Sequence, residues 1–121
     1  MENNNPFGET IYSYTRAQAI DDGVLVDLSQ FAVIRGHWKL QMCCTDAVWG
    51  IIETAVLREG KDYEGILHDI SMTAKLAIGR KGGDTLRFQC VVGSSLRSFK
   101  LHCGPGDTPV PVLTLMLPDE D

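Results

Sequence analysis

The chain has 121 residues, of which 44% are hydrophobic and 22% are charged, and its formal net charge at pH 7 is −5. This length fits one domain with a single core, and no apolar run approaches the ~20 residues of a membrane-spanning helix. The negative charge argues against a nucleic-acid binder with a broad basic surface, because phosphate neutralisation supplies most of the affinity of such proteins. It favours a basic protein partner, or simply keeps the protein soluble.

Composition along the chain divides it into three parts: a flexible N-terminal arm over residues 1–12, one α+β domain over 13–118, and an acidic tail over 119–121. The arm lacks the basic and apolar segments of a signal peptide, so a cytoplasmic location is expected. The four cysteines include no Cys-x-x-Cys pair. We therefore expect reduced, mostly buried thiols, with no metal site and no cofactor.

Two short helices are predicted near the N-terminus. Thr15 can cap the first, over residues 16–22, and Gly23 ends it. A brief strand or extended link over 24–26 leads to the second helix, which ends at Gly36. The candidate caps of this second helix are Asp27 and Ser29.

Two longer helices follow. The alternation over residues 38–43 predicts either a strand or an extended connector. Thr45 is a good N-cap for an amphipathic helix that reaches Gly60. The longest helix is predicted from about Asp62 to Arg80, because its apolar residues recur at helical spacing along one face.

Three strand-like runs occupy the C-terminal third. The runs over 85–92 and 98–103 alternate apolar and polar residues, and a turn centred on Ser94 and Ser95 would join them. That turn sets Phe88 opposite Leu101, and it also sets Cys90 opposite Phe99 and Leu86 opposite Cys103. The third run, over 112–117, is expected to start late or to lie at a sheet edge near Pro111, because the preceding prolines lack an N–H. The predicted fold is α+β: a three-stranded antiparallel meander covered on one face by the two longer helices, with the short N-terminal helices closing its edges.

The two ends of the chain carry a resemblance. The opening Tyr-Thr-Arg-Ala-Gln-Ala-Ile over 14–20 continues into residues 22–27, the helix start over 45–49 follows, and the close runs from Cys-Gly-Pro-Gly-Asp over 103–107 to Met-Leu-Pro-Asp-Glu-Asp over 116–121. In these segments the chain resembles a family of small uncharacterised proteins from plasmids, integrative elements and phages. The resemblance implies an accessory protein of a mobile element, a setting in which antagonists of host defence are common.

An enzyme or nucleotide-binding protein is the alternative. His68 and Asp69 could transfer a proton on the longest helix, with His37 or His102 joining them in the fold. The glycine-rich turn Gly104, Pro105, Gly106 and Asp107 resembles a phosphate loop in composition, but it precedes a strand and so lacks the helix dipole.

We prefer a non-enzymatic protein that binds, and inhibits or modulates, a host protein complex, for example a defence system such as CRISPR. Its candidate contacts are the carboxylates at the C-terminus and two tryptophans, each of which could instead belong to the solvated surface or to the core. These residues are Asp119, Glu120, Asp121, Trp38 and Trp49.

Overall fold

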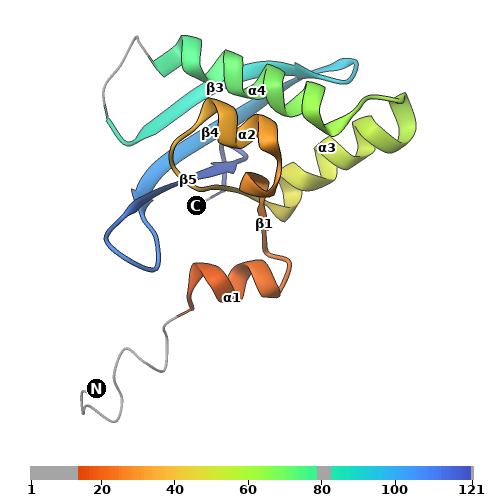
Figure 1. The fold of residues 1–121 in the computed structure, drawn as a ribbon. Coiled ribbons are helices and arrows are strands. Elements are labelled where there is room, and N and C mark those ends of the chain that lie inside the picture. Colours follow the sequence, from red (N-terminus) through yellow and green to blue (C-terminus); the bar gives the residue numbers. More distant parts are fainter. Residues whose placement is uncertain (1–13, 79–82, 121) are drawn as a thin grey trace, which may run out of the picture.

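The structure is a computed structural model that describes residues 14–78 and 83–120. It confirms the α+β class, with helices packed on a mixed sheet (Figure 1). In chain order the elements are α1 (Arg16–Asp21), β1 (Leu25–Asp27), the 3-10 helix η2 (Leu28–Gln30), α2 (Ala32–His37), β2 (Met42–Thr45), α3 (Asp46–Glu59), α4 (Tyr63–Ile78), β3 (Thr85–Val92), β4 (Ser95–Pro105) and β5 (Pro111–Met116). The arm predicted over residues 1–12 lies outside the described residues.

The sheet has five strands in the order β1-β2-β5-β4-β3, so it is larger than the three C-terminal strands predicted from the sequence. Those three strands, β3, β4 and β5, are neighbours and pair antiparallel. The additional strands come from the N-terminal half, and β2 runs parallel to β5 while the other pairs are antiparallel. Residues 38–41 connect α2 to β2, which begins only at Met42. Met42, Cys43 and Cys44 are all buried. A strand buried on both faces loses the alternation by which strands are recognised in a sequence.

The β3–β4 hairpin is shifted by two residues from the predicted register. Phe88 pairs with Phe99 rather than Leu101, because the turn is centred on Gly93 and Ser94. Gly93 has φ +66°, and positive φ at the first position alone is the requirement of a type II′ turn. A shift of two residues leaves each side chain on its predicted face, because side chains alternate with period two.

Strand β5 lies in the interior of the sheet, between β2 and β4, so the alternative of an edge strand was wrong. Pro111 stands at its first position, opposite Pro105, where a missing N–H costs no interior ladder bond. Pairing with β2 begins at Leu113, opposite Met42. The late start predicted for this strand therefore applies to its β2 side.

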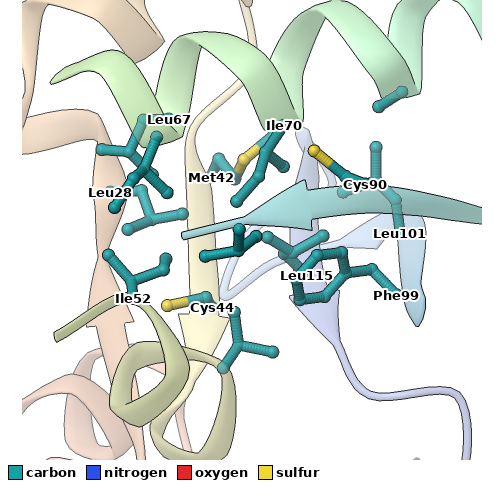
Figure 2. Close-up of a cluster of buried hydrophobic side chains, with 14 of the residues drawn as sticks. Leu28, Met42, Cys44, Ile52, Leu67, Ile70, Cys90, Phe99, Leu101 and Leu115 are labelled. Carbon is teal, nitrogen blue, oxygen red and sulfur yellow. The ribbon is translucent and has the colours of Figure 1, made fainter. Parts of the chain in front are cut away.

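Helices α3 and α4 cover one face of the sheet, as predicted, together with η2 and α2 (Figure 1). Between the helices and the sheet lies the core, part of which is drawn in Figure 2. Its members include residues from every layer: Leu28, Ile34, Met42, Cys44, Val48, Ile52, Ala55, Ile66, Leu67, Ile70, Ala74, Phe88, Cys90, Val92, Phe99, Leu101, Leu113 and Leu115. This cluster accounts for the apolar spacing along both longer helices.

Helix boundaries follow local capping. Thr45 accepts the backbone N–H of Val48, and Gly60, with φ +70°, ends α3. The second predicted helix is divided into η2 and α2, because Phe31 between them has extended backbone angles of φ −90° and ψ 132°. Gly36 lies inside α2 rather than after it, so this boundary was predicted wrongly.

The prediction that helix α1 closes an edge of the sheet was wrong. Helix α1 packs on the face of the sheet opposite the other helices (Figure 1). Its Arg16 bonds to Thr114, whose side chain lies between those of the buried Leu113 and Leu115 in sequence and so points away from the helical layer. The β3 side chains that point to this same face are exposed. We call this side the open face.

Candidate functional site

The glycine-rich turn holds the N-terminus of α1. The carboxylate of Asp107 accepts the backbone N–H groups of Arg16 at 2.6 Å and Ala17 at 3.1 Å. Two donors that an isolated helix would leave unpaired are thereby satisfied, and the negative charge suits the helix dipole. The carboxylate is thus engaged within the fold rather than presented to a phosphate.

A cleft of about 680 Å³ with polar and apolar lining residues lies beside this contact, with Arg16 in its wall. The Arg16 guanidinium donates to Gln41 Oε1 at 2.9 Å, Thr114 Oγ1 at 2.8 Å and the Leu113 carbonyl at 2.5 Å. This side chain therefore joins α1 to two other segments, the connector before β2 and strand β5. With its planar fork already shared among them, Arg16 serves the packing of α1 on the sheet.

The proton-transfer candidates do not come together as one group. His68 contacts His37, with 2.9 Å between Nδ1 and Nε2 and 4.9 Å between ring centroids, as expected for His37. His102 lies on β4 instead and contacts Thr85. Asp69 lines a separate cleft with Lys61, at the α3–α4 connection.

The histidine pair also meets a lysine. Lys75 Nζ lies 3.2 Å from His37 Nδ1, so both ring nitrogens of His37 have neighbours. Desolvation, followed by the positive charges of Lys75 and His68, lowers the pKa of His37 below its ordinary value of 6.5.

This shift predicts a pH dependence of stability. Below pH 6.5 the unfolded chain takes up a proton at His37 more readily than the folded chain, so we expect the free energy of unfolding to fall as pH drops through this value. A proton NMR titration of His37 Hε1 measures the shift directly. Lys75→Met should move the pKa back upward, whereas a wild-type pKa at or above 6.5 would contradict the assignment.

The acidic tail is anchored through Glu120. Its Oε1 accepts Thr45 Oγ1 and the backbone N–H of Leu117, each at 2.8 Å, and its carbonyl accepts Lys100 Nζ. Asp119 is exposed, and Asp121 lies outside the described residues. The tail therefore contributes to the fold through Glu120, while Asp119 faces solvent.

The two tryptophans occupy different settings. The Trp38 indole N–H donates to Ser71 Oγ at 3.0 Å, with Lys75 Nζ 5.9 Å from the ring centroid. Trp49 stacks on Tyr63, with ring centroids 5.2 Å apart and an interplanar angle of 7°. Phe31 lies 6.1 Å from Trp49 and 5.7 Å from Tyr63.

We call Phe31, Trp49 and Tyr63 the aromatic patch. All three rings are half-buried, so one part of each packs on the core and another part reaches solvent. From the sequence alone, Trp49 is a candidate contact, whereas Phe31 and Tyr63 are not. No local signal joins residues this far apart in the chain, so the stack could not be predicted.

The cysteines are free thiols. Burial raises the pKa of the Cys43, Cys44 and Cys90 thiols, which favours the unreactive protonated form. In the part of the chain that the structure describes, no three His, Cys, Asp or Glu side chains gather in a possible metal site.

In comparisons with known proteins, no family model, curated protein or solved structure matches this chain. Within residues 14–78 and 83–120, no helix has the length and apolar character needed to cross a bilayer.

Proposed function

We propose that this protein is a non-enzymatic binding protein that attaches to a host protein or protein complex and thereby inhibits or modulates it. The observation that carries the proposal is the aromatic patch, in which Trp49 and Tyr63 stack in parallel at the surface. Tryptophan and tyrosine are the side chains most enriched among the residues that dominate binding energy at protein interfaces. Their rings supply contact area with little loss of conformational entropy.

Carboxylates accompany the patch. Glu53 follows Trp49 by four residues and so shares its side of α3, and Asp62 and Glu64 flank Tyr63 in sequence. An arginine or lysine laid over the Trp49 and Tyr63 rings would gain a cation–π contact as well as the attraction of these carboxylates. The patch therefore favours a basic segment of the partner, in agreement with the net charge of −5.

The partner class follows from the resemblance to mobile-element proteins. Such accessory proteins meet host machinery, and we include a defence complex such as a CRISPR effector among the proposed targets. The exposed Asp119 remains a proposed additional contact for a basic surface, acting through long-range attraction that salt screens.

The test begins with affinity capture from host cells, followed by binding measurements with the purified captured protein. Trp49→Ala should weaken that binding by about tenfold or more, the effect of removing an interface anchor. Glu64→Lys should slow association, and more so at low salt, because a surface charge steers the encounter.

Two controls separate binding from folding. Leu57→Ala removes an apolar side chain that is 76% exposed on the same helix but outside the patch, and its affinity should equal that of the wild type. Trp49→Phe keeps much of the packing and should recover part of the affinity at a wild-type melting temperature. If Trp49→Ala stays folded and binds as tightly as the wild type, the patch is not the docking site.

A further inference from the structure

We propose that the free edge of β3 pairs with the same edge of a second copy of this chain, so that two sheets join into one continuous antiparallel sheet. The inference concerns a different surface from the aromatic patch. It rests on the open edge of the sheet, on a strand sequence that is complementary to itself, and on apolar side chains of α4 beside that edge.

Strand β3 has eight residues and, among the described strands, pairs only with β4. The Asp84 carbonyl accepts the N–H of Cys103 on β4. Since hydrogen-bonded positions alternate along an antiparallel pair, the backbone groups of Leu86, Phe88 and Cys90 also point toward β4. The backbone N–H and C=O groups that point to the free edge therefore belong to Thr85, Arg87, Gln89 and Val91.

Among the residues that the structure describes, this edge lacks three common protections against pairing: proline, a bulge and a row of charged side chains. Strand β3 contains no proline, and its ladder with β4 runs without a bulge from Thr85 to Val92. Arg87 is the one charged residue of β3, and its side chain points to the open face and does not block the edge. An edge of this length with unpaired donors and acceptors is a template for another strand.

A register centred on Phe88 uses all four outward-facing residues. In this antiparallel pairing Arg87 faces the second copy's Gln89, and Thr85 faces the second copy's Val91, with each pair occurring twice by symmetry. No like charges stand directly opposite, and a β-branched pair forms at each end. On the helical face, Phe88 meets the second copy's Phe88.

Helix α4 extends this surface. A groove of about 880 Å³ runs between the helix and the strand, lined by Thr73, Leu76 and Ala77 on the helix side. Leu76 is 73% exposed and its neighbour Met72 is 41% exposed. Strand pairing brings the second copy's α4 alongside this groove, where these apolar side chains become buried. Backbone pairing and apolar burial thus favour the same occupant.

The first measurement is the mass of the full chain by sedimentation equilibrium over a concentration series. We expect association toward twice the 13.3 kDa of one chain, strengthened by salt because the two copies carry the same net charge. In the dimer, hydrogen exchange at the amides of Arg87, Gln89 and Val91 should slow as concentration rises. A monomer throughout the series, with fast exchange at these amides, would overturn the proposal.

Substitutions at Gln89 test the register. Gln89→Glu places a carboxylate opposite the second copy's Arg87, so dimerisation should strengthen several-fold although the net repulsion between the chains increases. Gln89→Arg places a second cation opposite the second copy's Arg87. This variant should weaken dimerisation several-fold although the net repulsion between the chains decreases. Because Gln89 is exposed, both variants should keep the wild-type melting temperature at dilution. Effects of the opposite sign would overturn this register.

Gln89→Pro removes an outward N–H that the single chain does not use, and edge strands tolerate proline at such positions. The variant should be monomeric, whereas Gln89→Thr, which keeps the N–H, should remain dimeric. A folded Gln89→Pro variant that still dimerises would show that the copies meet at another surface.

Discussion

Replacing Phe99 with alanine is expected to lower the free energy of unfolding by about 3–5 kcal/mol. The side chain is 0% exposed, and its ring centroid lies 5.7 Å from that of Phe88 on the neighbouring strand. Removing it leaves a cavity between the sheet and the helices, which a densely packed core fills only in part. Because a small domain has ~5–15 kcal/mol of stability in total, the variant should show a greatly lowered midpoint in urea or heat.

The matched control for Phe99 is Leu96→Ala in the same hairpin. Leu96 is 61% exposed, so its truncation should change the free energy of unfolding by no more than about 0.5 kcal/mol. If Phe99→Ala cost only as much as this control, the apolar face of β4 would be assigned wrongly. The comparison therefore tests the alternation that defines the hairpin as well as the core.

Replacing Arg16 with alanine is expected to cost about 2–3 kcal/mol, which is large for a side chain outside the main core. The guanidinium bonds to Gln41, Thr114 and Leu113, and its loss leaves three acceptors without that donor. Water can enter the cleft beside Arg16 and replace part of this bonding, so the cost stays below the sum of three charged hydrogen bonds. Chemical denaturation monitored by circular dichroism measures it.

Arg16→Lys separates charge from geometry. A lysine keeps the positive charge, but one ammonium cannot reproduce the planar donor fork that joins three segments. We expect most of the loss to persist in this variant, whereas replacing the exposed Arg97 of β4 with alanine should leave the stability of the wild type. Full stability in Arg16→Lys would mean that charge alone holds α1 on the open face.

These two residues show how the fold distributes its stabilising contacts. Phe99 belongs to the continuous core, whereas Arg16 ties α1 to the face that the core does not reach. Asp107 provides a second attachment for α1, because its carboxylate accepts the first backbone N–H groups of that helix. Arg16 and Asp107 thus hold α1 in place with polar contacts, because Ala19 is the buried residue of that helix and supplies little apolar surface.

Local chemistry in the sequence determined much of the architecture. Thr45 and Gly60 bound α3 because the cap and the left-handed turn are properties of a few neighbouring residues. The alternation around Phe88 determined which face of β3 is buried, and it did so even though the register was predicted two residues away. Period-two patterns survive such a shift, since every side chain keeps its face.

Only the tertiary structure decided which distant segments meet. Strand β2 joined the sheet beside β5 because its consecutive apolar residues need cover on both faces, and that need has no local signature. The same holds for Trp49 and Tyr63 in the aromatic patch and for Glu120 on Thr45. Residue type determined what these side chains can bond to, whereas the packing of helices on the sheet determined what they actually contact.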